Sequence, residues 1–342
     1  MRYGYWMPVF GGWLRNVADE GMDASWDYVR RLAQRAEQIG FDLTLIAELN
    51  LNDIKGKDAP SLDAWSTAAA IAAVTERQEL MVAVRPNFHQ PGLFAKAAAN
   101  IDRISNGRLS LNVVSSWWAD EAKQFGLQFD QHDDRYARSA EWLDVVNGLW
   151  TRDRFDFDGK FYHMEQAILS PKPVRRPPIY AGGESEAAKA MIARKCDAYV
   201  MHGDAVEDIA PKIVDMAARR DSFGGSPMHY GMAAYAIVRD SEAEAERELE
   251  RILEVRDHPP GYDNFDQWLS GTQLERELKI REYSVSNRGL RPNLIGTPEQ
   301  LRQRIADFEG VGLDLLLLQF SPQAEEMERF AAQVIGEPAI AA

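Results

Sequence analysis

The fold is decided by the stretch Ser105-Asn106-Gly107-Arg108-Leu109-Ser110-Leu111-Asn112-Val113-Val114-Ser115-Ser116, which is followed by Trp117 and Trp118. Its glycine is typical of a helix end, and residues 109–114 form a largely apolar run that predicts a short buried strand. Such runs are typical of parallel sheets covered by helices on both faces. Ligands of these folds bind at the carboxyl ends of the strands, so the polar and aromatic residues at 115–118 indicate a candidate site.

Asn112 places an amide inside this apolar run. Because buried polar groups are hydrogen-bonded in folded proteins, we expect the amide to have a partner. Two partners are open at this point: neighbouring backbone inside the sheet, or a ligand held at the end of the strand. The rest of the chain favours a ligand.

Outward from this stretch, strand-like and helix-like patterns alternate along the whole chain. Strands are predicted at 3–8, 43–47, 79–84, 109–114, 179–181, 198–201, 230–238 and 313–319. Helical spacing is found between them, at 26–39, 62–73, 93–104, 135–150, 185–195, 206–220, 242–255, 298–308 and 324–335. Eight strand-helix units predict an α/β fold, a (β/α)8 TIM barrel formed as one domain by residues 1–342.

Helix ends and two long connections complete this picture. Gly40, Gly107 and Gly312 stand where helices should end, and Thr297-Pro298-Glu299-Gln300 has the pattern of a capped helix start. An insertion is expected after strand 4, at 119–178, with a helix and a hairpin of strands 155–157 and 160–163 that turns at 158–159. A second lies between strands 7 and 8, at 256–294, and is interpreted as a mobile lid loop.

Charge and composition exclude several classes of partner. Lys and Arg number 39 against 53 Asp and Glu, a net charge of −14, which disfavours nucleic acid and anionic membranes. No apolar run approaches the roughly 20 residues of a membrane span, and no secretory signal precedes the first strand. Cys196 is the single cysteine, so no intrachain disulfide is possible. We expect a cytoplasmic protein without nucleic-acid or membrane partners.

The expected strand ends are poor in acids and in metal ligands. The six histidines are scattered and no His-x-His follows the first strand, so no metal is expected. Paired glycosidase acids and the Gly-x-Ser-x-Gly elbow of serine hydrolases are also missing. Glu48 is the one acid at a strand end, either in a salt bridge or at the substrate. Such a barrel typically takes its reactivity from an organic cofactor.

Two segments suit a phosphate group. Ala181-Gly182-Gly183-Glu184-Ser185 follows a strand and opens a helix, where free N–H groups and the helix dipole favour an anion, although a tight turn has the same pattern. Residues 132–139 open another helix, and the hydroxyl of Tyr136 with a cationic His132 or arginine would close over the same phosphate. The alternative for this segment is a solvated first helical turn.

Several motifs extend along nearly the whole chain: residues 33–41, Val84-Arg85-Pro86, residues 98–108, residues 112–117, residues 132–136, residues 157–162, Pro171-Lys172-Pro173, Gly182-Gly183-Glu184-Ser185 and residues 293–298. In this order they resemble the bacterial-luciferase-like flavin monooxygenases. The branch is that of the alkanesulfonate, dimethylsulfone and ring-opening pyrimidine monooxygenases.

The resemblance implies an enzyme that receives reduced FMN from a separate NAD(P)H-dependent reductase and uses O2 to oxygenate a small molecule, as a homodimer or homotetramer. The flavin ring would face Asn112, Val114 and Ser115. Its phosphate would lie at the cofactor-binding group His132, Tyr136, Gly182, Gly183, Glu184 and Ser185. The remaining candidates are catalytic or substrate-facing: Glu48, Arg85, Trp117 and Tyr235, with Trp6, Phe10, Arg288 and Arg291 at the pocket wall or lid.

The substrate is inferred from the seventh strand, Gly231-Met232-Ala233-Ala234-Tyr235. The related alkanesulfonate enzymes carry an Arg and a His where this chain has Ala233 and Tyr235, so a sulfonate would lose its anion clamp. The resemblance therefore favours a small neutral sulfone such as dimethylsulfone, with C–S cleavage. Alternatives are an alkanesulfonate, a carbonyl or amide substrate, a non-catalytic flavin-binding protein, and a deazaflavin-dependent dehydrogenase.

Overall fold

A computed structural model describes residues 1–127, 129, 131–254, 260–263 and 284–336. Eight parallel strands close into a barrel in the order β1-β12-β9-β8-β7-β4-β3-β2, so the predicted fold is confirmed. The barrel strands are β1 (Arg2–Trp6), β2 (Leu43–Ile46), β3 (Glu79–Val84), β4 (Leu109–Val113), β7 (Ile179–Ala181), β8 (Ala198–Met201), β9 (His229–Tyr235) and β12 (Leu315–Gln319).

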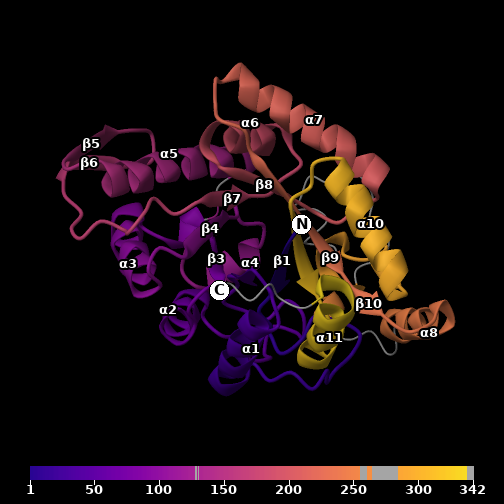
Figure 1. The fold of residues 1–342 in the computed structure, drawn as a ribbon. Coiled ribbons are helices and arrows are strands. Elements are labelled where there is room, and N and C mark those ends of the chain that lie inside the picture. Colours follow the sequence, from indigo (N-terminus) through magenta and orange to yellow (C-terminus); the bar gives the residue numbers. More distant parts are fainter. Residues whose placement is uncertain (128, 130, 255–259, 264–283, 337–342) are drawn as a thin grey trace.

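Helices surround these strands as a ring (Figure 1). Those that alternate with the strands are α1 (Trp26–Gln38), α2 (Ala64–Val74), α3 (Pro91–Ile104), α5 (His132–Thr151), α6 (Glu186–Lys195), α7 (Val206–Ser222), α8 (Glu242–Leu253), α10 (Pro298–Gly310) and α11 (Gln323–Phe330). Shorter helical turns are α4 (Ala119–Gln124), η1 (Pro86–Phe88), η2 (Pro260–Tyr262), η4 (Ser286–Arg288) and η5 (Ala331–Ile335).

The residues predicted to end or start helices have the backbone conformations and capping contacts that the sequence indicates. Gly40, Gly107 and Gly312 have φ values of 101°, 82° and 96°, in the left-handed region that glycine adopts without a steric cost. Thr297 and Gln300 form a capping box at the start of α10. These local signals position the helices relative to the strands they follow.

The barrel interior is packed with apolar side chains, and the barrel closes where its first strand, β1, pairs with its last strand, β12. Its cluster consists of Leu43, Leu45, Met81, Tyr180, Ala198, Leu315 and Leu317. Gly4 lies among them, and a Cβ at this position would stand 2.8 Å from Leu43 and 2.9 Å from Leu317. The side chains of β2 and β12 thus fill the space that β1 leaves, and β1 pairs with β12 from Arg2↔Leu315 onward.

The seventh strand and the insertion after strand 4 differ from expectation. The predicted strand 230–238 ends at Tyr235, and β10 (Ile237–Val238) instead pairs with β11 (Ile295–Gly296) outside the barrel. The hairpin consists of β5 (Phe155–Asp158) and β6 (His163–Ala167), so its second strand begins later than predicted. Glu141 of α5 accepts the backbone N–H groups of Lys160 and Phe161, at 2.9 Å and 2.8 Å, which keeps these residues in the connecting loop.

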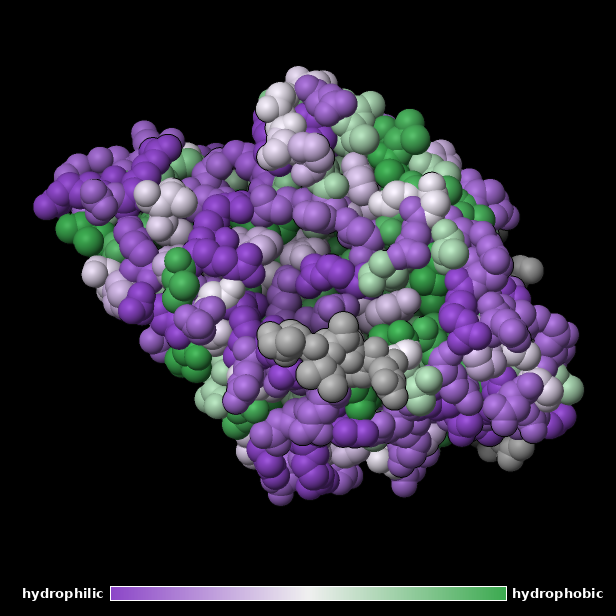
Figure 2. Space-filling view, viewed as in Figure 1, coloured by the Kyte–Doolittle hydropathy of each residue, from purple (hydrophilic) through white to green (hydrophobic). Residues whose placement is uncertain are grey.

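The surface is largely polar. On the face in Figure 2, hydrophilic residues predominate and apolar ones form small separate patches. Within the described ranges, no helix combines the length and the apolar character needed to cross a membrane.

One helical glycine tests the packing of the insertion. A Cβ on Gly148 of α5 would overlap the ring of Phe155 on β5. We expect Gly148→Ala to lower the free energy of unfolding by roughly 1–3 kcal/mol, despite the better helix propensity of alanine. Gly310→Ala is the control, because a Cβ there meets no atom within 4 Å. Urea denaturation of both variants decides the point, and equal stabilities would contradict the packing described.

Candidate functional site

A cavity of about 280 Å³ opens at the carboxyl ends of the barrel strands. Its wall combines polar groups from the strand ends with aromatic side chains from the loop after β1. The predicted site residues that line it are Trp6, Phe10, Glu48, Arg85, Asn112, Val114, Ser115, Trp117, Tyr136, Gly182, Gly183, Glu184 and Ser185. The structure therefore brings most of the predicted site together in one place.

Tyr235 does not line this cavity. It is 1% exposed and packs in a side cluster with Leu14, Ile237 and Ile252. Burial raises the pKa of its hydroxyl well above the ordinary value. The residue of β9 that faces the cavity is Ala233.

The two predicted loop arginines also lie away from the cavity wall, in ion pairs. Arg288 is 1% exposed and binds the carboxylate of Glu184. Lys212 lies 3.3 Å from Glu184 and 3.1 Å from Asp204, and Arg291 lies 3.6 Å from Asp204. This network attaches the described segment 284–291 to the turns that follow β7 and β8. Of the predicted His132, the side chain lies outside the described part.

Arg85, at the end of β3, is held by carboxylates on two sides. Both terminal nitrogens of its guanidinium donate to Glu121 of α4, with Nη2 2.9 Å from Oε1. Glu48 Oε2 accepts the backbone N–H of Arg85 at 2.7 Å, and its Oε1 lies 2.5 Å from Nε2 of His89. The guanidinium also stacks over Phe88 at 4.0 Å. Its charge is therefore balanced within the protein, and Glu48 is engaged in a structural role.

The turn between β7 and α6 forms a cradle on the same cavity wall, two strands along the barrel from Arg85 in the order β3-β4-β7. Gly183 has a φ of 155°, and a Cβ there would stand 2.5 Å from Ala188 Cβ and 3.2 Å from the Tyr136 hydroxyl. Ser185 caps α6 by accepting the N–H of Ala188. Burial raises the pKa of Tyr136, so its hydroxyl remains a donor at neutral pH. The N-terminus of α6, the hydroxyls of Tyr136 and Ser185, and the open backbone at Gly183 together suit a phosphate group.

The end of β4 contributes a strained turn and an aromatic wall. Ser116 is buried with a φ of 49°, a conformation that L-residues seldom adopt and that clusters at functional sites. Trp117 lines the cavity and stacks on the fully buried Trp118, with ring centroids 5.3 Å apart. Asn112 also lines the cavity, and its side chain makes no hydrogen bond to the described residues. No backbone or side-chain group of the described residues pairs with this amide, and a ligand as its partner stays a prediction.

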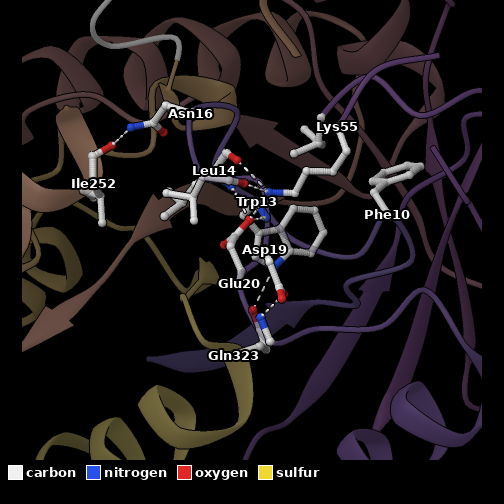
Figure 3. A network of polar contacts seen from close by, with 12 residues as sticks. Phe10, Trp13, Leu14, Asn16, Asp19, Glu20, Lys55, Ile252 and Gln323 are labelled. Atoms are coloured by element: carbon white, nitrogen blue, oxygen red, sulfur yellow. Dashed lines mark hydrogen bonds and ion pairs between the residues drawn. The ribbon is translucent and has the colours of Figure 1, made fainter. Parts of the chain in front are cut away.

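Of the wall that the loop after β1 provides, sequence reasoning predicted Phe10 but missed Trp13 and Arg15. Trp13 lines the cavity and meets Trp6 edge to face, with centroids 6.0 Å apart. Figure 3 shows why it is held there: the Glu20 carboxylate accepts the backbone N–H of Trp13 at 2.8 Å, and Lys55 lies 2.6 Å from the same oxygen. Irregular loops of this kind have no periodicity from which such contacts follow.

The same loop contacts both flanks of the segment predicted as a lid. Arg15 donates to Gly261 O at 3.1 Å and to Ser286 Oγ at 3.2 Å, and Asn16 donates to Ile252 O at 2.6 Å. Most of the predicted segment 256–294 lies outside the described residues. Its described parts are attached to the cavity wall on both sides.

Comparisons with known proteins agree with this architecture. A family model described as luciferase-like monooxygenase matches residues 1–315. The chain is 34% identical over 344 residues to an FMNH2-dependent dimethylsulfone monooxygenase of Pseudomonas fluorescens (strain Pf0-1), covering 98% of this chain and 93% of that protein. A protein of the same name from Pseudomonas putida is 33% identical over 346 residues, with 98% and 94% covered. The structure of long-chain alkane monooxygenase matches with a TM-score of 0.84 at 18% identity. The match covers 100% of this chain and 93% of that chain, and shows the same fold.

His202, which lines the cavity beside the ion-pair network, gives a pH-dependent prediction. Burial, with a contribution from the Arg288 charge, lowers its pKa to about 4. Between pH 6.5 and 4 the unfolded chain therefore binds a proton that the folded chain does not, and stability falls as the pH falls. We expect the wild type to lose about 2 kcal/mol more unfolding free energy between pH 7 and 5 than His202→Gln does. Equal losses in the wild type and in His202→Gln would contradict this account.

Proposed function

Because the chain belongs to the luciferase-like monooxygenase family, we propose that it uses reduced FMN and O2 to oxygenate a small neutral sulfone of the dimethylsulfone type. The observation that carries the choice of a neutral substrate is the pairing of Arg85 with Glu121 at the cavity wall. The names of the two Pseudomonas relatives, which share about a third of the sequence over nearly its full length, support both the cofactor and the substrate class.

The cavity has the features that FMN requires. We assign its phosphate to the cradle of Gly183, Ser185 and Tyr136, where a side chain in place of the glycine would collide with its neighbours. The unpaired amide of Asn112 lies in the same cavity and supplies hydrogen bonds for the polar edge of the flavin ring. When bound, reduced FMN supplies the electrons with which O2 is activated.

An anionic substrate fits this cavity poorly. A sulfonate needs a free guanidinium or ammonium group, whereas Arg85 is committed to Glu121 and Arg15 lies 2.5 Å from Asp53. Separating such a buried pair costs several kcal/mol. On β9 the cavity-lining residue is Ala233, so this strand also offers no positive charge to a sulfonate. A compact molecule without net charge needs none of these pairs to break.

The aromatic side chains serve the chemistry by excluding water. Trp6, Phe10, Trp13 and Trp117 come from separate parts of the chain and surround the space beside Asn112. A dry wall of this kind limits the hydrolysis of reactive intermediates. The tryptophans also make the site easy to observe, since a ligand stacked among them quenches their fluorescence.

We also propose that a separate NAD(P)H-dependent reductase delivers the reduced FMN, and that the enzyme acts in the cytoplasm as a homodimer or homotetramer. FMNH2 dependence in the names of the relatives supports a reductase partner. The single cysteine suits a reducing compartment.

The proposed function is tested by binding and by product. Anaerobic titration with reduced FMN should quench tryptophan fluorescence at lower concentration than titration with oxidised FMN. With reduced FMN and O2, dimethylsulfone should then be consumed with formation of a sulfinate, faster than an alkanesulfonate or a pyrimidine amide. Preferential consumption of the sulfonate or the amide would replace the sulfone as substrate, and no binding of either flavin would refute the cofactor assignment.

Releasing Arg85 should change this preference. In Glu121→Gln the guanidinium loses its bidentate partner and keeps only Glu48, 3.6 Å from its Nε, so its terminal nitrogens become available to an anion and we expect the ratio of sulfonate to sulfone binding to rise about tenfold. The unfolding free energy should fall by roughly 3 kcal/mol because a buried charge loses its partner. Glu79→Gln, which breaks the pair with Arg2 at the other end of the barrel, is the control and should not alter the ratio. A folded Glu121→Gln enzyme with the wild-type ratio would contradict this account.

A further inference from the structure

We propose that Gln319 and Trp6 are the substrate-binding donors of this enzyme: their neutral N–H groups hold the sulfonyl oxygens at the floor of the cavity. This inference rests on the proposed function and deepens it by naming the groups that recognise the sulfone. It follows from the buried Gln319 and the half-buried Trp6, which both line the cavity and have buried polar atoms without a hydrogen-bond partner among the described residues.

Gln319 is the last residue of β12 and is 1% exposed. Within the described structure neither its Oε1 nor its Nε2 has a hydrogen-bond partner, although the side chain lines the cavity. Buried amides in folded proteins are almost always paired, because an unpaired one loses its hydration without compensation. An amide that is unpaired and faces a cavity indicates a partner that arrives from outside.

Trp6 ends the neighbouring strand β1, one residue beyond the register pair Tyr5↔Leu318. Gln319 likewise follows Leu318, so the two side chains leave adjacent strands at the same level of the barrel. The indole Nε1 of Trp6 is buried and has no partner among the described residues. An indole N–H is a donor without acceptor capacity, so it selects an oxygen or another acceptor.

The neighbouring Trp13 differs from Trp6, because the indole N–H of Trp13 has a hydrogen-bond partner. Trp13 packs edge to face on Trp6, yet its own Nε1 donates to Gln323 Oε1 at 2.7 Å. Gln323 in turn donates to the backbone oxygen of Trp6 at 3.2 Å. This arrangement keeps the Trp6 backbone and ring in position, whereas its N–H remains available to a ligand.

A sulfone matches these groups in charge and in pattern. It carries two oxygen acceptors and no N–H or O–H donor, so the indole N–H and the amide NH2 group are complementary to it. The adjacent methyl C–H bonds are polarised by the sulfonyl group and suit the amide oxygen as weak donors. Because neither group is charged, they do not provide the ionic clamp that a sulfonate needs.

The test compares Gln319→Met with Gln78→Met. Methionine has nearly the size of glutamine and no amide, so the first substitution should remove the substrate contacts without leaving a cavity. Gln78 is also a buried glutamine, but it lies at the other end of the barrel and donates to Ala33 O at 3.0 Å. Trp6→Phe removes the second donor and keeps an aromatic ring.

We expect Gln319→Met and Trp6→Phe each to raise the KM for dimethylsulfone, and its calorimetric Kd in the presence of oxidised FMN, about tenfold. The Kd of FMN should not change. Without ligand, Gln319→Met should melt at or above the wild-type temperature because it removes unpaired polar atoms. Gln78→Met should melt lower, because it breaks bonds that are made, and should keep the wild-type KM.

The outcomes separate the two levels of the proposal. If the wild type does not turn over dimethylsulfone, the proposed function fails. If the wild type does so and Gln319→Met keeps the wild-type KM and Kd, the assignment of Gln319 fails while the function stands. A weaker FMN Kd in Gln319→Met would make the amide a flavin contact and would also overturn the inference.

Discussion

The pairing of Arg85 with Glu121 is the constraint on which the chemistry of the cavity depends. Removing a guanidinium and a carboxylate from water is costly, and this pair is supported by two parallel hydrogen bonds and by the ring of Phe88. Glu121 also accepts the backbone N–H of Asn50 at 2.5 Å. One carboxylate on α4 thus connects the ends of β2 and β3 and cancels a positive charge beside the cavity.

The charged and the uncharged polar groups around the cavity have different roles. Two arginines at or near the cavity are held in ion pairs that position segments of chain: Arg15 with Asp53, and Arg288 with Glu184. Three uncharged groups that line the cavity, the amides of Asn112 and Gln319 and the indole of Trp6, make no hydrogen bond to the described residues. These ion pairs therefore stabilise the fold of the cavity wall, whereas the uncharged amide and indole groups remain available to hydrogen-bond a ligand.

Local sequence patterns were sufficient for the barrel and for much of the site. Each barrel strand is a short apolar run, and a parallel barrel places the end of each run at one rim, so residues such as Asn112 and Gly183 could be grouped without coordinates. Tyr235 shows the limit of this reasoning: it pairs with Gln319, but its N–H bonds to Gly289 O at 2.7 Å and the chain then leaves the barrel. The partner of Arg85 was equally inaccessible, because it depends on where an insertion folds back.

The pairing of β1 with β12 has a consequence for the synthesis of this protein. Arg2 lies opposite Leu315, so the first strand has no partner on that side until more than 300 further residues have left the ribosome. At the usual rate of about 5–20 residues per second, this wait is on the order of tens of seconds. During that time the nascent chain presents an open strand edge, which is a template for association with other chains. Protection of the first strand during synthesis is therefore a requirement that the stability of the finished barrel does not meet.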